Sequence, residues 1–78
     1  MKSFNDKLNI AINFHKKNNI QEALKIYLEL LKTEKENLNL LYLIGTSYIQ
    51  TKKIELSINY FEKALKINKN HLQSLNNL

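Results

Sequence analysis

A period of 34 residues runs through the chain and limits its fold more than any other feature. When residues 4–37 are placed on residues 38–71, large apolar, small and aromatic residues fall on residues of similar kind. The matching pairs are Ile10 and Ile44, Ala11 and Gly45, Phe14 and Tyr48, Ile20 and Ile54, Ala23 and Ser57, Tyr27 and Phe61, and Leu31 and Leu65. A third copy begins at Leu72, since Leu72, Leu75 and Leu78 follow the pattern of Leu38, Leu41 and Ile44. A fixed period of this length is typical of stacked repeat proteins, which mostly bind other molecules rather than transform them.

Apolar residues recur at helical spacing in each copy and predict four helices and the start of a fifth. The expected helices cover about residues 4–17, 20–35, 38–51 and 54–68, and the fifth opens at about residue 70. Ser3 and Asn37 precede helices and are suited to cap them. Asn19, with Glu22 three residues later, resembles a capping box.

The connections between the predicted helices are short, so consecutive helices must be antiparallel neighbours. The expected turns are Asn18-Asn19 and Lys52-Lys53. Small residues should lie where helices cross, with Ala11 near Ala23 and Gly45 near Ser57. On the fourth helix, the residues expected to point inward are Ile58, Phe61, Ala64 and Leu65.

The second copy carries the clearest motif. It reads Leu41-x-x-Ile44-Gly45-x-x-Tyr48 on one helix, followed by Ser57, Phe61 and Ala64 on the next. This pattern of large, small and aromatic positions resembles the tetratricopeptide repeat, and the resemblance covers essentially the whole chain. It implies an all-α fold of antiparallel helix pairs in a right-handed superhelix, with about five helices. The chain is then a single module over residues 1–78, with repeats at 4–37 and 38–71 and the start of a third at 72–78.

Two departures from the family pattern concern the ends of the module. Lys7 occupies a position where the family prefers Trp or Leu facing a preceding repeat, which suits a first repeat. The third copy ends at Leu78 and has no polar helix to close the array. Leu72, Leu75 and Leu78 would then be left partly bare, and burying such a side chain contributes about 1.5–3 kcal/mol. We therefore expect either a fragment of a longer array or self-association through this end.

The amino-acid composition limits the kinds of partner that the chain is expected to bind. The net charge of +5 comes from twelve Lys and no Arg, and the Lys residues gather near predicted helix ends, where they complement the helix dipole. A nucleic-acid-binding surface would need a denser basic stripe, preferably with Arg. No segment is long and apolar enough for a signal peptide or a membrane span, and there is no Cys. We expect a soluble cytoplasmic protein that binds neither nucleic acid nor membrane.

No constellation of residues predicts catalysis, a cofactor or a metal site. His15 and His71 stand apart without Cys or suitably spaced carboxylates, so both are interpreted as surface histidines. Glu34 and Glu36 flank Lys35 at a helix end and are interpreted as a solvated charged run rather than an acid–base pair. We expect a non-enzymatic chain that holds no cofactor.

The resemblance assigns a candidate binding face, because the first helix of each pair lines the concave side of this family's superhelix. Transferred position by position, that face comprises Asn5, Leu8, Asn9, Ile12 and Lys16 in the first copy, Asn39, Tyr42, Leu43, Thr46 and Gln50 in the second, and Gln73, Asn76 and Asn77 in the third. Within it, Leu8, Ile12, Tyr42 and Leu43 predict an apolar patch. The flanking Asn amides offer donors and acceptors to a peptide backbone.

Two specialised binding modes of the family can be compared with these positions. Chaperone-binding members hold a terminal carboxylate with Lys, Asn, Asn, Lys and Arg. The corresponding residues here are Leu8, Ile12, Leu43, Gln73 and Asn77, so that clamp is absent. Asn9 and Asn77 match the Asn ladder of arrays on O-GlcNAc-transferase-like enzymes, although Leu43 interrupts it.

The sequence predicts a non-catalytic module that binds a protein or peptide in its concave groove. An alternative is the N-terminal repeat segment of a larger enzyme, similar to a glycosyltransferase or sulfotransferase, that presents substrate to a catalytic domain. A third possibility is a structural spacer or self-assembly unit.

Overall fold

The computed structural model describes residues 3–68, which form four helices and no strand. The helices are α1 (Phe4–Lys16), α2 (Ile20–Leu31), α3 (Leu38–Gln50) and α4 (Ile54–Asn68). This confirms the all-α class and all four expected helices. The predicted fifth helix and the third copy, including Leu72, Leu75 and Leu78, lie outside the described residues.

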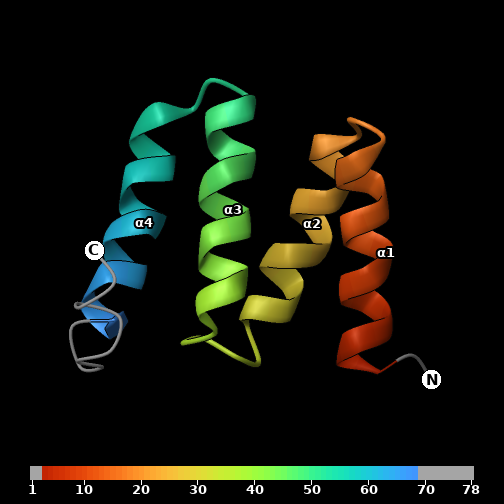
Figure 1. Cartoon of the computed structure of the whole chain (residues 1–78), viewed down its shortest axis with the longest axis horizontal. Coiled ribbons are helices and arrows are strands. Elements are labelled where there is room, and N and C mark those ends of the chain that lie inside the picture. Colours follow the sequence, from red (N-terminus) through yellow and green to blue (C-terminus); the bar gives the residue numbers. More distant parts are fainter. Residues whose placement is uncertain (1–2, 69–78) are drawn as a thin grey trace.

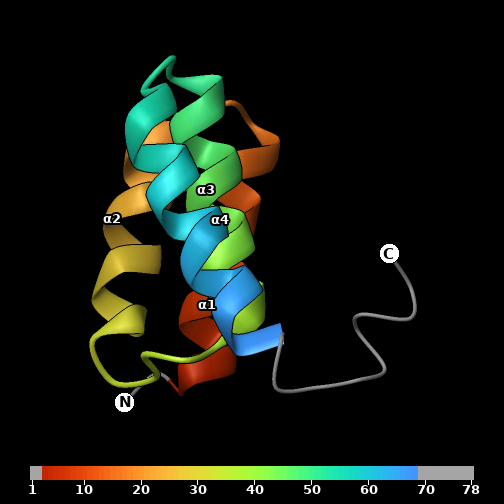
Figure 2. The ribbon, with the colours of Figure 1, turned by 90° about the vertical axis from the view of Figure 1, so that its left-hand side faces the viewer.

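Each helix packs against the next along the chain: α1 on α2, α2 on α3, and α3 on α4 (Figure 1). Viewed from the side of α4, α2 stands to the left of α1 and α3 (Figure 2). That side is the rear of the molecule in the view of Figure 1. The first helices of the two pairs, α1 and α3, therefore share one side of the molecule, and we call it the α1/α3 face.

The first and third helices end in the same way. Asn18 and Lys52, which correspond under the 34-residue shift, both have positive φ, 67° and 66°. The next residue donates its backbone N–H to the fifth carbonyl before it: Asn19 to Phe14 at 2.8 Å, and Lys53 to Tyr48 at 2.7 Å. A left-handed residue after the C-cap satisfies carbonyls that the helix leaves unpaired. The predicted turns are confirmed, and the first helix of each pair ends with the same geometry.

Two of the three predicted N-caps are confirmed. The Ser3 hydroxyl accepts from the Asp6 amide at 3.2 Å, and the Asp6 carboxylate accepts from the Ser3 amide at 3.3 Å, which is a capping box. The Asn37 side chain accepts from the Leu40 amide at 3.1 Å. The predicted cap at Asn19 is wrong, because its side chain makes no capping hydrogen bond.

The second helix is shorter than expected, ending at Leu31 rather than near Lys35. At this end the Leu30 carbonyl accepts three bonds, from the Thr33 hydroxyl at 3.0 Å, the Thr33 amide at 3.1 Å and the Glu34 amide at 3.2 Å. A side chain that bonds to the backbone in this way competes with continuation of the helix.

The core lies between the layers and is built from small and large residues in alternation. One buried cluster comprises Ala11, Ala23, Leu24, Tyr27, Leu30, Leu40 and Ile44. Ala11 and Ala23 are completely buried within it, as expected for residues at a helix crossing. At Gly45, a Cβ atom would lie 2.8 Å from Cε1 and Cζ of Phe61, so the missing side chain makes room for that ring.

Two of the four residues expected to point inward on α4 do not. Ala64 is buried and Phe61 is half-buried, but Ile58 and Leu65 are 48% and 49% exposed. The face of α4 that packs on α3 includes Ser57 and Ala64, and no other helix of the described part contacts α4. The prediction for Ile58 and Leu65 is wrong because helical periodicity identifies an apolar face without supplying a neighbour to cover it.

Candidate functional site

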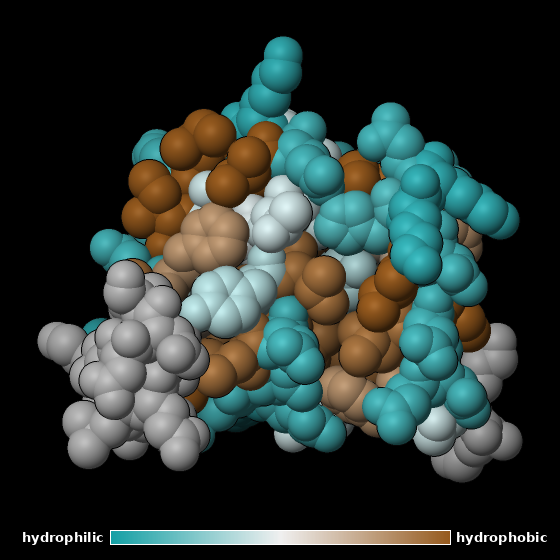
Figure 3. All heavy atoms as spheres, in the orientation of Figure 1, coloured by the Kyte–Doolittle hydropathy of each residue, from teal (hydrophilic) through white to brown (hydrophobic). Residues whose placement is uncertain are grey.

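The residues predicted for the concave face divide into two groups on α1 and α3. The polar side chains and Tyr42 are exposed: Asn5, Asn9, Lys16, Asn39, Tyr42, Thr46 and Gln50. The remaining three, Leu8, Ile12 and Leu43, are half-buried and pack against the core. Apolar surface therefore shows between polar groups on the α1/α3 face (Figure 3). Gln73, Asn76 and Asn77 lie outside the described residues.

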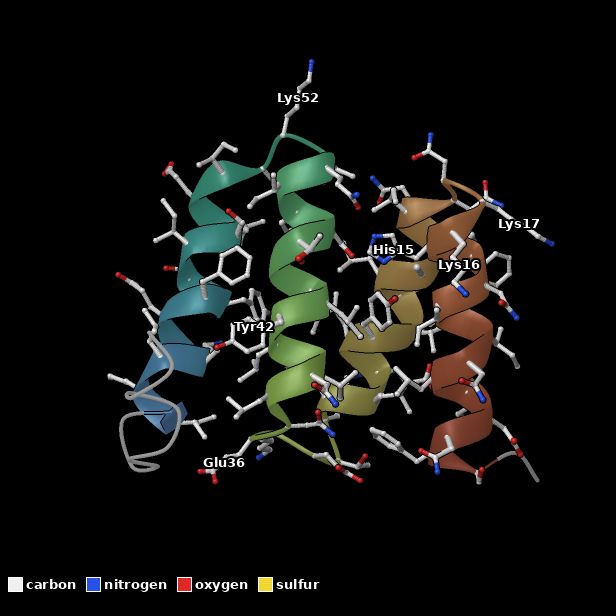
Figure 4. The ribbon with its side chains drawn as sticks, viewed as in Figure 1. His15, Lys16, Lys17, Glu36, Tyr42 and Lys52 are labelled. Carbon is white, nitrogen blue, oxygen red and sulfur yellow. The ribbon has the colours of Figure 1, made fainter. Side chains whose placement is uncertain are left out.

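Tyr42 is the largest of these exposed side chains, with 39% of its surface accessible. It extends from α3 toward α4, where its ring lies 6.2 Å from that of Phe61, tilted by 40° (Figure 4). Tilted aromatic pairs at this separation are favourable. The Phe61 ring also lies against Gly45, so it packs between the glycine and Tyr42.

His15 connects three helices at the same face (Figure 4). Its Nε2 lies 2.6 Å from Gln50 Oε1 on α3, and its Nδ1 lies 3.1 Å from the Tyr27 hydroxyl on α2. With the amide oxygen as acceptor, Nε2 carries the proton and Nδ1 accepts from Tyr27. The interpretation of His15 as a surface histidine is therefore wrong, because it is half-buried with two partners. One of those partners is Gln50, a predicted site residue.

The pKa values of two tyrosine hydroxyls are raised. Burial raises the pKa of Tyr27 above its ordinary value of 10.0. Burial, and secondarily the nearby Tyr60, raise the pKa of Tyr48. The Tyr48 and Tyr60 rings lie 5.6 Å apart, across the α3–α4 pair. Both shifts favour neutral phenols, which remain available as hydrogen-bond donors at ordinary pH.

Charge is sparse among the predicted site residues. Of those that the structure describes, Lys16 alone carries a formal charge. Lys7 pairs with Glu29 of α2 at 3.9 Å, and both side chains are largely exposed. An exposed pair of this kind contributes about 0–1 kcal/mol at most. Lys7 therefore stays in solvent at a position where Leu41, its counterpart in the second repeat, is buried.

Sequence reasoning missed an exposed apolar line on α4. Ile54, Ile58 and Leu65, here called the α4 stripe, are about half exposed (51%, 48% and 49%). Their counterparts in the first repeat are Ile20, Leu24 and Leu31, which are buried or half-buried where α3 packs on α2. A comparison of equivalent positions in the two copies, 34 residues apart, could have identified this surface from the sequence.

Within residues 3–68, no three His, Cys, Asp or Glu side chains gather in a way that could hold a metal ion. None of the helices in that range has the length and apolar character needed to cross a membrane.

A family model described as Tetratricopeptide repeat matches residues 38–71. These are the residues of the second predicted repeat, of which α3 and α4 make up most of the described part, residues 38–68. Searches of curated proteins and of solved structures gave no significant match.

The match confirms, for residues 38–71, the resemblance to the tetratricopeptide repeat seen in the sequence. Repeats of this class are typically non-catalytic modules that mediate protein–protein interactions.

Proposed function

We propose that the chain is a non-catalytic module that binds a protein or peptide on its α1/α3 face. The observation that carries this proposal is Tyr42, a large aromatic side chain that is exposed while its ring is held by Phe61. Exposed, pre-positioned aromatic residues dominate the energetics of protein interfaces. The half-buried Leu43 and Ile12 supply neighbouring apolar contact.

Amide side chains border this apolar area and would satisfy a peptide backbone. Asn9 and Asn39 are exposed, and each has two donor hydrogens and one acceptor oxygen. Gln50 is already engaged by His15, so we propose that it positions the face rather than bonding a ligand directly. The low charge of the face favours a peptide over a phosphate backbone, whose recognition depends on clustered basic residues.

We further propose that residues 72–78 begin a third repeat, as the 34-residue period indicates. The α4 stripe supports this proposal, because the same positions on α2 are covered by the first helix of the following repeat.

The test is affinity capture from the source cell with the parent chain and a Tyr42→Ala, Asn9→Ala double variant. A Leu56→Ala, Asn59→Ala double variant is the matched control, because it removes an exposed apolar side chain and an Asn from α4. Captured proteins are identified by mass spectrometry, and their affinities are measured by calorimetry.

We expect the Tyr42→Ala, Asn9→Ala variant to lose at least one partner that the control retains. The loss of the aromatic anchor should cost about 2 kcal/mol or more. Equal capture by both variants would refute the proposal. So would captured nucleic acid that dissociates steeply as salt rises.

A further inference from the structure

A second groove lies away from the α1/α3 face, between the C-terminal half of α2 and the middle of α4. It encloses about 480 Å³. Its apolar lining consists of Leu28, Leu31, Leu41 and Tyr60. Figure 2 shows α2 and α4 as the two outer helices on this side, with α3 behind α4.

The floor of this groove is closed. Leu41 of α3 is only 1% exposed, while Leu28, Leu31 and Tyr60 are half-buried along the walls. A closed, shallow floor can accept one or two inserted side chains.

Three lysines border the apolar lining: Lys32 and Lys35, which follow the end of α2, and Lys63 on α4. No carboxylate lines the groove. The ion pairs found within residues 3–68 use Lys7 and Lys25, so none neutralises this cluster. The Lys63 ammonium lies 4.5 Å from the centre of the Tyr60 ring, which holds its charge beside the lining.

A groove with an apolar lining and unneutralised lysines at its border is complementary to a segment that carries both apolar and acidic side chains. We propose that this groove, here called the lysine groove, binds an acidic segment of a partner protein that inserts leucine-like side chains between α2 and α4. Carboxylates on either side of the inserted residues would pair with the lysines, and such complementarity fixes register and orientation. A second copy of this chain is a poor occupant, because its net charge of +5 would be repelled.

The experiment uses a fluorescent 14-residue probe with two leucines flanked on both sides by glutamates, followed by fluorescence anisotropy. The test variant is Lys32→Glu, Lys35→Glu. The control is Lys17→Glu, Lys52→Glu, which changes the net charge equally at two turn lysines remote from the groove (Figure 4). Circular dichroism checks that both variants fold.

We expect the probe to bind the parent and the control, and to bind the test variant at least about tenfold more weakly. Replacing the two probe leucines by serine should also weaken binding about tenfold, because the apolar lining then has no partner. Equal loss in both charge variants would overturn the proposal in favour of general Coulomb attraction. Retention of binding by the serine probe would do the same.

Two further arms separate other classes of ligand. Phosphatidylserine vesicles and a single-stranded oligonucleotide are titrated against the same variants. Stronger dependence on Lys32 and Lys35 for either ligand than for the peptide would overturn the assignment to an acidic protein segment. The lysine groove shares no residue with the α1/α3 face, so its failure and that of the proposed function are distinguishable.

Discussion

Replacing Gly45 by leucine should overpack the crossing of α3 and α4. An added Cβ alone would lie 2.8 Å from Cε1 and Cζ of Phe61 and 3.0 Å from its Cδ1. Carbon atoms prefer separations of about 3.5–4.0 Å, so the ring would have to move by about 0.5–1 Å for this atom alone. The remaining leucine carbons would enter space that the ring and α4 already fill.

The magnitude follows from two opposing terms. Overpacking a well-packed site costs about 1–3 kcal/mol. Leaving glycine in a helix interior costs about 1 kcal/mol relative to a good helix former, so the substitution recovers about that amount. We expect Gly45→Leu to lower the free energy of unfolding by up to about 2 kcal/mol. Gly45→Ala should be close to neutral, because the half-buried Phe61 ring can shift toward solvent and the propensity gain offsets that movement.

Urea unfolding followed by circular dichroism measures these changes, and a double-mutant cycle identifies their cause. Phe61→Ala removes the ring that leucine would meet, so the double variant should be more stable than the sum of the single effects by about 1–3 kcal/mol. Additive effects would refute the packing argument, as would a Gly45→Leu chain more stable than the parent.

Three further predictions concern the other contacts described above. His15→Ala should lower the free energy of unfolding by about 1–3 kcal/mol, because the buried Tyr27 hydroxyl loses its partner. Urea unfolding measures this change. Gln50→Ala should cost less, since its bond to His15 is exposed. Leu24→Ala should cost about 2–4 kcal/mol and Ile58→Ala less than about 1 kcal/mol by the same assay, because Leu24 is 7% exposed and Ile58 is 48% exposed. Finally, burial raises the pKa of Tyr27, so the neutral phenol should stabilise the fold below about pH 10, and this stabilisation should be lost above that pH. Absorbance at 295 nm would report tyrosinate, and circular dichroism would report unfolding.

Each of these predictions has an outcome that contradicts it. His15 would be no more than a surface residue if its removal changed nothing. Equal costs at Leu24 and Ile58 would mean that the α4 stripe is covered in solution, which would favour the proposed third repeat. In the alkaline titration, the sign follows because the unfolded chain releases the phenolic proton first. Helical signal that persists after all four tyrosines have ionised would exclude the Tyr27 effect.

Local chemistry made the helices predictable. Ser3 and Asn37 sit at their capping positions, and each bonds the amide three residues later, which needs no tertiary contact. Asn19 and the end of α2 were predicted incorrectly for an equally local reason. At the end of α2, the Thr33 hydroxyl and amide share the Leu30 carbonyl with the Glu34 amide, and such side-chain bonds compete with continuation of the helix.

The candidate face could be assigned from position in the repeat, but the hydrogen-bond partners of its residues could not. Nothing in the neighbourhood of His15 in the sequence indicates that it bonds residues 12 and 35 positions away. Those bonds depend on how α1, α2 and α3 cross. The lysine groove likewise draws residues from α2, α3 and α4, and no single helix contains its pattern.

The sequence by itself determined the positions of the four helices, the turns within each helix pair and the resemblance of residues 38–71 to the tetratricopeptide repeat, because each depends on periodicity and on bonds between near neighbours. Tertiary structure alone decided which apolar faces are covered and which polar groups meet. Leu24 and Ile58 occupy the same repeat position, yet one is buried beneath α3 and the other is about half exposed. Burial belongs to a side chain together with whatever packs against it, so an identical local pattern can become core in one repeat and surface in the next.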